Sequence, residues 1–222
     1  MPTYFVGSRD RKTIIFPGGA QLGGLDPGDA MTKQEEKAAL RKVALAKRDA
    51  LSVEHRIEKS MSAANYGAGN IKFDPGTIVS GFFPIRSEID PRPLMDALRQ
   101  QGARLCLPVV MDKTTIVFRE LLRTAELVDT GFGTRGPGAE AEVLDPEVLI
   151  MPLSVFDHHG GRIGYGAGHY DRAIAKIIER GISPKLIGMA FDCQMHERVP
   201  VEAHDQPLDA MLTETGYREA NS

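Results

Sequence analysis

Short apolar runs alternate with helical segments from Thr77 onward, and this alternation constrains the fold most. The runs are continuously apolar, which suits strands that are buried on both faces of a sheet. Pro91–Gln101 and Tyr170–Arg180 have the pattern of helices, and Gly102 and Gly181 stand where these helices would stop. Strands that alternate with helices predict a three-layer α/β/α sandwich with a mostly parallel sheet. The predicted strands are Thr77–Ile85, Leu105–Val110, Thr115–Glu120, Val148–Phe156 and Leu186–Phe191.

The first 31 residues differ from this pattern in composition. They contain six glycines and three prolines, with short β-like runs at Tyr4–Val6 and Thr13–Phe16. We expect residues 1–31 to be an extension outside the main core. Residues 32–222 are then expected to form one domain, which is long enough to bury a sizeable core.

Two helices are predicted between this extension and the first strand. Thr32 and Glu35 have the spacing of a capping box, and Ser52 can cap the second helix. Gly67 is expected to mark the end of the second helix. The predicted helices are Lys33–Ala50 and Val53–Asn65. Helical spacing predicts an apolar face on the first helix made of Leu40, Val43, Ala44, the aliphatic stem of Lys47, and Leu51.

Charge and cysteine content exclude several classes of protein. The 222 residues include 27 Lys plus Arg and 30 Asp plus Glu, so the formal net charge is −3. A negative balance argues against bulk nucleic-acid binding, which needs a basic surplus or face. No apolar run approaches the roughly 18–20 residues that span a bilayer. Cys106 and Cys193 cannot form a disulfide framework or a four-cysteine zinc site, and both lie in strand-like contexts that suit small buried side chains. We expect a cytoplasmic monomer.

The most informative segment is the glycine-rich stretch from Gly160 to Arg172. It follows a buried strand and opens a helix, which is where α/β proteins bind ligands. Glycines at 164, 166 and 168 allow backbone N–H groups to turn toward an anion, and the helix adds its positive end. The segment lacks the G-K-[ST] of a Walker A loop, and His169 interrupts a G-x-G-x-x-G frame. Phosphate binding is the favoured interpretation, and a tight structural crossover is the alternative.

Acidic side chains near this segment are candidates for binding. Asp171 falls in the first turn of the predicted helix. It is either an acid that the helix dipole stabilises or a ligand that holds the magnesium of a nucleotide. Asp205 follows the last predicted strand and is a second candidate ligand. Glu88 lies just past the first strand, as a site residue or as a helix-capping acid.

Basic residues follow one side of the first helix. Lys37, Arg41 and Arg48 are spaced as i, i+4 and i+11. By themselves they favour a solvated basic face over a binding site.

Several of these motifs together resemble the 5-formyltetrahydrofolate cyclo-ligase family. The resemblance extends from about Lys33 to Glu214, and its main signature is Gly161–Arg172. Further matches, in the same order along the chain, are Lys37–Arg41, Ser87–Asp90, Met151-Pro152, Val199-Pro200, His204-Asp205 and Thr213-Glu214. The resemblance implies a three-layer α/β sandwich. It also implies ATP- and Mg²⁺-dependent cyclisation of 5-formyltetrahydrofolate to 5,10-methenyltetrahydrofolate, with release of ADP and phosphate.

The resemblance also implies roles for individual residues. It implies that folate binds near Phe83, Glu88, Tyr165 and Tyr170, and that Asp171 and Asp205 hold magnesium. No protein nucleophile is implied, since the reaction mainly requires alignment and charge neutralisation. The residues implied to bind ATP are Lys37, Arg41, Arg162, Ile163, Gly164, Tyr165, Gly166, Ala167, Gly168, His169 and Tyr170.

This sequence departs from the family pattern at a few positions. Many relatives have Gly or Lys at the position of Ala167, Tyr at His169, and an acid at Gly136. The residues before Met31 have no counterpart in the family's common core. One alternative is a non-catalytic nucleotide- or RNA-binding relative, which the negative net charge and the presence of Lys37 and Asp205 disfavour. A sugar-phosphate or CoA-handling enzyme is another alternative, but we find no motif for its catalytic glutamate.

Overall fold

The computed structural model describes residues 31–131 and 133–221, so the extension predicted for residues 1–31 lies outside the described residues, apart from Met31. The helices are α1 (Lys33–Asp49), α2 (Val53–Asn70), α3 (Arg92–Gln100) and α4 (His169–Glu179), with a short 3-10 helix at Asp192–Gln194. The strands are β1 (Ile78–Ser80), β2 (Arg104–Val110), β3 (Ile116–Glu120), β4 (Leu127–Asp129), β5 (Arg135–Pro137), β6 (Val143–Leu144), β7 (Val148–Pro152), β8 (Val155–Phe156), β9 (Arg162–Ile163), β10 (Lys185–Met189), β11 (Ala210–Thr213) and β12 (Gly216–Glu219).

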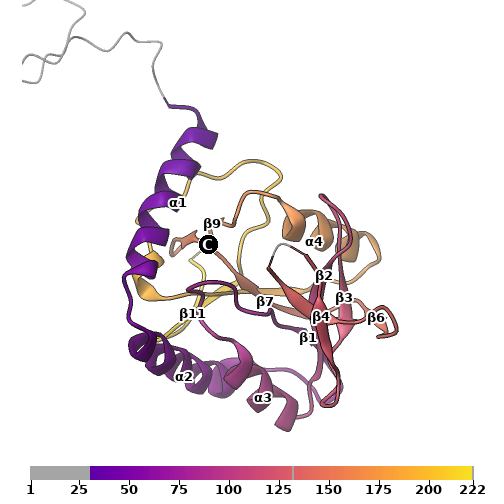
Figure 1. Ribbon diagram of the computed structural model, residues 1–222. Helices are drawn as coiled ribbons and strands as arrows, with labels where there is room; N and C mark the ends of the chain where they lie inside the picture. The colour runs from indigo at the N-terminus through magenta and orange to yellow at the C-terminus, as the bar shows by residue number, and fades with distance from the viewer. Residues whose placement is uncertain (1–30, 132, 222) are drawn as a thin grey trace, which may run out of the picture.

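An eight-stranded sheet forms the centre of the fold, with the strand order β12-β11-β10-β7-β1-β2-β3-β6. The run from β11 to β2 is parallel, while β12, β3 and β6 join antiparallel at the edges. Figure 1 shows α2 and α3 on one side of the sheet and α4 on the other. The predicted three-layer α/β/α sandwich with a mostly parallel sheet is therefore confirmed.

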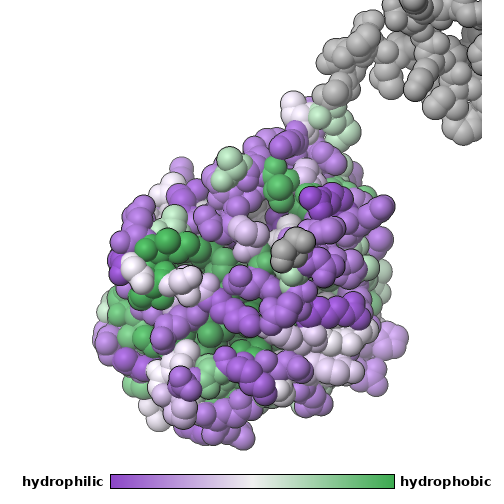
Figure 2. All heavy atoms as spheres, turned by 180° about the vertical axis from the view of Figure 1, so that it is seen from behind, coloured by the Kyte–Doolittle hydropathy of each residue, from purple (hydrophilic) through white to green (hydrophobic). Residues whose placement is uncertain are grey.

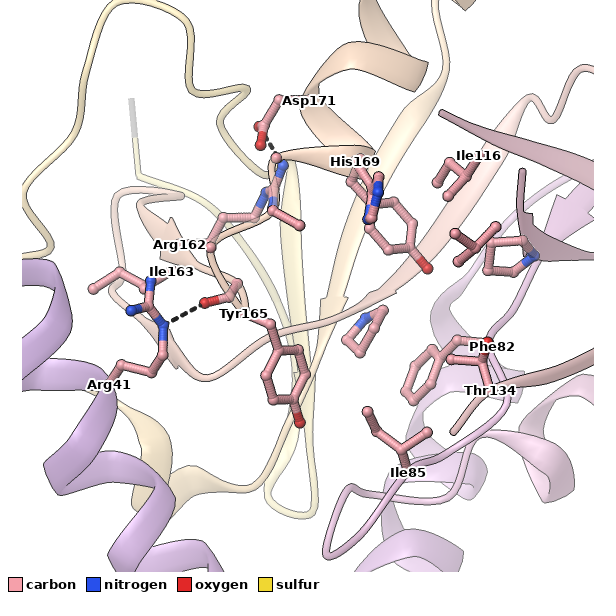
Figure 3. Close-up of a pocket in the computed structure, with 18 of the residues that line it drawn as sticks. Arg41, Phe82, Ile85, Ile116, Thr134, Arg162, Ile163, Tyr165, His169 and Asp171 are labelled. Atoms are coloured by element: carbon pink, nitrogen blue, oxygen red, sulfur yellow. Dashed lines mark hydrogen bonds and ion pairs between the residues drawn. The ribbon is translucent and has the colours of Figure 1, made fainter. Parts of the chain in front are cut away.

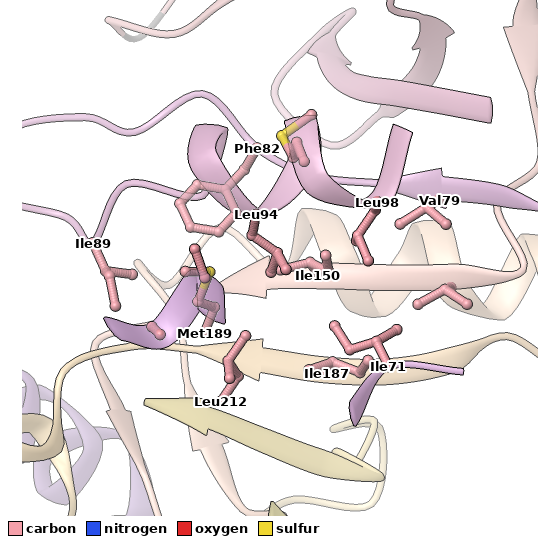
Figure 4. Close-up of a cluster of buried hydrophobic side chains, with 14 of the residues drawn as sticks. Ile71, Val79, Phe82, Ile89, Leu94, Leu98, Ile150, Ile187, Met189 and Leu212 are labelled. Atoms are coloured by element: carbon pink, nitrogen blue, oxygen red, sulfur yellow. The ribbon is translucent and has the colours of Figure 1, made fainter. Parts of the chain in front are cut away.

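The two faces of the sheet have separate hydrophobic cores. Alternate residues of β7 point to opposite faces, as the two-residue period of a strand requires. Ile150 joins the cluster under α2 and α3 (Figure 4), which includes Leu94 and Leu98. Leu149 and Met151 join the cluster under α4. This two-sided burial explains why β7 is apolar at every position.

The order of the strands places a crevice next to β1 and β7. After β1 the chain continues through α3 to β2, whereas after β7 it continues through α4 to β10 on the other side. The strand order therefore reverses between β1 and β7. In open α/β sheets, ligands bind at the carboxyl ends of the strands where this reversal occurs.

The helix caps agree with the sequence prediction, but the end of α2 differs from it. Thr32 and Glu35 form the predicted capping box, and the Ser52 hydroxyl accepts the His55 N–H. However, α2 continues past Gly67 to Asn70, which corrects the predicted end near Asn65. A Cβ on Gly67 would lie within 2.8 Å of two leucine side chains. This glycine therefore allows close packing inside the helix and does not mark its end.

The buried face of α1 also differs from the prediction. Val43 and Lys47 are exposed, although both were predicted on the apolar face. The buried residues are Lys37, Ala44 and Arg48. Ala44 packs on the hairpin of β8 and β9. Because α1 covers this hairpin and not the sheet, its contact face contains charged groups.

Several predicted strands are shorter than expected, because the chain leaves the sheet at its carboxyl edge. The predicted strand Thr77–Ile85 is a strand only at β1, and the residues after Ser80 turn to surround a cavity. Val148–Phe156 divides into β7 and β8, and β8 pairs with β9 in a separate two-stranded sheet. The predicted loop 130–141 contains β5, which pairs with β4.

The two cysteines have different surroundings. Cys106 is fully buried, and burial raises the pKa of its thiol to about 12, in agreement with an inert packing role. Cys193 is half-buried in the short 3-10 helix, so its predicted strand context is wrong.

Hydrophilic side chains cover most of the face shown in Figure 2, with smaller hydrophobic groups between them. Within the described part of the chain, no helix has the length and apolar character needed to span a membrane.

Candidate functional site

A cavity of about 620 Å³ lies at the carboxyl ends of the central strands. This volume is in the range of small-molecule binding sites. Every residue that the sequence singled out for ATP, folate or magnesium binding lines it, although these residues come from distant parts of the chain. They are Lys37, Arg41, Phe83, Glu88, Arg162, Ile163, Gly164, Tyr165, Gly166, Ala167, Gly168, His169, Tyr170, Asp171 and Asp205.

The cavity has a polar wall and a more apolar wall. In Figure 3, Arg41, Arg162 and Asp171 lie on one side, and Phe82 and Ile85 lie across from them. The polar wall comes from α1, the glycine loop and the segment before β11, whereas the apolar wall comes from the segment after β1 and from β2. A ligand with an anionic part and a flat apolar part matches this division.

The glycine loop owes its shape to local backbone requirements. The buried Asp157 carboxylate accepts the His159 and Gly161 N–H groups, which closes the turn between β8 and β9. Gly166 and Gly168 have φ values of 101° and 64°, a region that favours glycine. Gly168 caps α4 without a side chain, so the loop leads directly into the positive end of the helix. This geometry is suited to an anion.

Basic residues of α1 point into the polar wall. Lys37 Nζ lies 2.7 Å from Glu202 Oε2 and 2.6 Å from Asp205 Oδ2. Burial would lower the pKa of Lys37, but these carboxylates outweigh it and raise the pKa. Arg41 Nε donates to the Gly164 carbonyl at 2.8 Å, and burial lowers the pKa of Arg41. The solvated basic face is therefore wrong, since Lys37 and Arg48 are buried and each of the three contacts the site.

The two acids predicted to hold magnesium are differently engaged. Asp171 Oδ1 accepts from Arg162 Nη2 at 2.5 Å and from the Gln206 N–H. Asp205 instead pairs with Lys37. Burial alone would raise the pKa of Asp205, but its hydrogen bonds with Lys37 and the Glu202 N–H lower it. Ligand atoms of Asp205, Glu202 and His204 lie within 4.8 Å of one another, a group that does not include Asp171.

Glu88 faces the cavity from the segment between β1 and α3. Its Oε2 accepts the Ile85 N–H, and its Oε1 accepts the Tyr165 hydroxyl at 2.8 Å. Burial raises the pKa of Glu88, while these donors and Arg48 partly offset the increase. The alternative of a helix-capping acid is wrong, because α3 begins at Arg92 and Glu88 contacts a turn before it.

Two polar residues that contact predicted site residues, Arg48 and Glu202, were not themselves predicted as binding residues. Arg48 is 1% exposed and contacts Ser87 and Tyr165. Its spacing from Arg41, two helical turns further along α1, is the signal that could have identified it. Glu202 lies three residues before Asp205, and its contact with Lys37 depends on a loop that no local pattern predicts.

The fold and the cavity define a doubly wound α/β protein with a glycine-rich loop where the strand order reverses. Residues 33–214 match the model of the 5-formyltetrahydrofolate cyclo-ligase family. This match covers most of the chain, so the protein belongs to that family, as the sequence motifs predicted.

Individual relatives agree with this assignment. The 5-formyltetrahydrofolate cyclo-ligase of Escherichia coli K12 is 34% identical over 141 residues, covering 61% of this chain and 76% of the relative. The mouse 5-formyltetrahydrofolate cyclo-ligase is 23% identical over 197 residues, covering 83% and 97%. Among solved structures, the Aquifex aeolicus 5,10-methenyltetrahydrofolate synthetase superposes with a TM-score of 0.65 at 29% identity, covering 84% of this chain and 93% of that one.

Proposed function

We propose that the protein converts 5-formyltetrahydrofolate to 5,10-methenyltetrahydrofolate and consumes ATP. The observation that carries this proposal is that every residue implied to bind ATP, folate or magnesium lines one cavity. In the proposed reaction, the formyl oxygen attacks the γ-phosphorus of ATP and ADP leaves. The folate N10 then attacks the activated formyl carbon, and the departing phosphate takes the formyl oxygen with it. No protein nucleophile is required.

The polar wall is suited to the triphosphate. Lys37, Arg41 and Arg162 bring three positive groups to the cavity, and the loop around Gly166 adds backbone N–H groups. Preorganised positive groups stabilise the charge that develops during phosphoryl transfer. In this proposal Lys37 moves from its carboxylate partners to the nucleotide phosphates.

The opposite wall is suited to the folate. Phe82, Phe83 and Ile85 offer apolar surface to a flat heterocycle, and Glu88 offers a hydrogen-bond acceptor within it. Tyr170 also lines the cavity, and its buried hydroxyl has no hydrogen-bond partner among the described residues. A buried hydroxyl normally has a partner, so substrate is a natural candidate.

Magnesium is the cation that the family resemblance implies, and its proposed ligands are Asp205 and Asp171. Carboxylate oxygens are the protein ligands that Mg²⁺ prefers, so the donor chemistry fits. Glu202 adds a second carboxylate next to Asp205, and both now pair with Lys37. When bound, the ion would neutralise charge on the transferring phosphates.

An absorbance assay for 5,10-methenyltetrahydrofolate tests the proposed function. The purified protein receives 5-formyltetrahydrofolate, ATP and Mg²⁺, and ADP release is measured in parallel. We expect product and ADP in a 1:1 ratio, with neither formed when ATP is omitted. A folded sample that binds ATP without turnover would contradict the proposal and favour the non-catalytic relative.

We also propose that the protein acts as a cytoplasmic monomer without nucleic acid. The net charge of −3 supports this proposal, since nucleic-acid binding needs a basic surface. Light scattering after size exclusion should give the mass of one chain, and added RNA should leave its elution unchanged.

A further inference from the structure

A directional set of hydrogen bonds runs from α1 to Glu88. Both Nη atoms of Arg48 lie 3.1 Å from the Tyr165 hydroxyl oxygen, and that hydroxyl donates to Glu88 Oε1 at 2.8 Å. Arg48 Nε donates to the Ser87 hydroxyl at 3.0 Å, and Ser87 in turn donates to Asp49. Two polar paths therefore start at one buried guanidinium.

The chemistry of these groups allows only one direction of donation. An arginine side chain donates and cannot accept, whereas a tyrosine hydroxyl has one proton and two lone pairs. The two N–H groups of Arg48 occupy the lone pairs of Tyr165, so the phenolic proton must point to Glu88. Ser87 likewise accepts from Arg48 and gives its only proton to Asp49.

We propose that Arg48 is a positioning residue that acts through the Tyr165 hydroxyl to hold the Glu88 carboxyl as an oriented hydrogen-bond acceptor for substrate. Each oxygen of Glu88 receives one donor, from Tyr165 and from the Ile85 N–H. A carboxyl group that accepts at both oxygens favours its charged form. Arg48 does not line the cavity, so its effect on substrate passes through Tyr165 and Glu88.

This inference rests on the proposed function for the identity of the ligand. The pyrimidine edge of a folate carries adjacent N–H donors, and an ionised carboxylate is the complementary acceptor. A protonated Glu88 would present an O–H donor to these N–H groups. A rotated Glu88 would no longer align its oxygens with them. The path from Arg48 should therefore affect affinity for the folate more than affinity for ATP.

Other charged and titratable groups also face Glu88. Arg86 lies on its own segment, and Tyr170 faces it from α4. Arg48 from α1 and Tyr165 from the glycine loop complete the set. Because Arg86 and Tyr170 are present in every variant of this set, the contribution of the path can be measured separately.

A double-mutant cycle tests the path. Tyr165→Phe removes one hydroxyl from a side chain that is 38% exposed, and Arg48→Met replaces the guanidinium with an apolar chain. Each single variant should raise the KM for the folate roughly tenfold, and this change should exceed any change in the KM for ATP or in kcat. The double variant should resemble the worse single variant, since both remove the same path.

Two further variants keep the cycle interpretable. Arg99→Met removes another largely buried arginine, one that donates to the Leu121 carbonyl outside the cavity, and should leave the folate KM unchanged. If Arg48→Met does not fold, Arg48→Lys replaces it in both backgrounds. Lysine keeps the positive charge but cannot reproduce the donation to Ser87 together with the two hydrogen bonds to Tyr165. Arg48→Lys should therefore raise the folate KM, but by less than Arg48→Met does. This increase should occur only when Tyr165 is present.

A measurement without substrate distinguishes this inference from the proposed function. Carbon-13 NMR of labelled glutamate, assigned with Glu88→Gln, reports the pKa of the Glu88 carboxyl. Removing the donor path should raise that pKa in Tyr165→Phe and in Arg48→Met, and the increase in the double variant should not exceed that in Arg48→Met. The inference would be overturned if the folate KM of the double variant rose by the product of the two single-variant increases. It would also be overturned if the pKa of Glu88 were the same in the single variants as in the wild type. If the variants show the expected pKa changes but the wild-type protein has no turnover, the proposed function is overturned instead.

Discussion

Helices α1 and α3 both pack against the rest of the domain, yet their buried faces are opposite in character. Helix α3 buries Leu94, Met95 and Leu98 against the sheet. Helix α1 buries Lys37 and Arg48 around a single alanine. The hydrophobic effect explains the first face, whereas the second face costs desolvation that only specific partners offset.

This difference separates structural from functional burial. A helix that packs on a sheet needs an apolar stripe, and α3 has one. A helix that forms a wall of a binding cavity can bury charge when ion pairs and hydrogen bonds compensate it. We therefore expect substitutions on the buried face of α1 to reduce activity, and those on α3 to reduce stability.

Replacing Lys37 should have the largest effect. Lys37→Met removes a positive group proposed to contact phosphate, so kcat/KM of the folded protein should fall roughly 10²–10³-fold. Lys47→Met is the matched control, because Lys47 lies on the exposed side of the same helix. Steady-state kinetics and thermal unfolding of both variants give the comparison. Equal activity in the two variants would refute a catalytic role for this face.

Truncating α3 should give the opposite result. Leu98 is fully buried, and Leu98→Ala should lower the free energy of unfolding by about 2–5 kcal/mol. The folded fraction should keep its KM values. Leu122→Ala removes the same atoms from an exposed site and should change stability by less than about 0.5 kcal/mol. Urea titration measures both, and a specific rise in KM for Leu98→Ala would show that α3 also shapes the site.

A side chain at Gly166 should affect nucleotide binding next. This glycine has a φ of 101°, and an added Cβ would lie 3.5 Å from Arg41 Nη2. Gly166→Val should weaken ATP binding roughly tenfold to a hundredfold, measured by calorimetry. Gly181→Ala tests the same backbone strain away from the cavity, and should cost about 1 kcal/mol of stability with normal ATP affinity. Normal ATP binding by folded Gly166→Val would leave the loop as a structural crossover.

The smallest effect concerns pH and the buried Glu88. Because burial raises its pKa in the folded protein, the folded state retains this proton at pH values where the unfolded state has released it. Wild-type stability should therefore fall relative to Glu88→Gln as pH rises from about 4.5 through the raised pKa, and then stay constant. Melting temperatures of both proteins between pH 4 and 8 measure this difference. A difference that does not vary with pH would show that Glu88 has the same pKa in both states.

Features that depend on neighbouring residues were predicted well. The capping box at Thr32, the cap at Ser52 and the left-handed glycines 102 and 181 all occur where the sequence indicated. The glycine loop precedes a helix, as predicted, and three of its glycines, Gly160, Gly166 and Gly168, have positive φ. These features are set by the conformation of a few adjacent residues, so local patterns suffice to predict them.

Strand ends and the buried face of α1 were not predicted correctly. The apolar run from Thr77 to Ile85 continues past β1 because its second half lines a cavity and not a sheet. Apolar composition reports burial, and it does not distinguish a strand from a cavity wall. Val43 was similarly assigned to a core that α1 does not contact.

By itself, the sequence determined the layered architecture, the helix caps, the position of the glycine loop and the membership of the family. Only the tertiary structure decided that Lys37 pairs with Asp205 and that Arg48 directs Tyr165 toward Glu88. These contacts join residues that lie 77 to 168 positions apart in the chain. The free energy of burying a charge depends on which partner lies within hydrogen-bond distance, and packing between distant segments alone determines that partner.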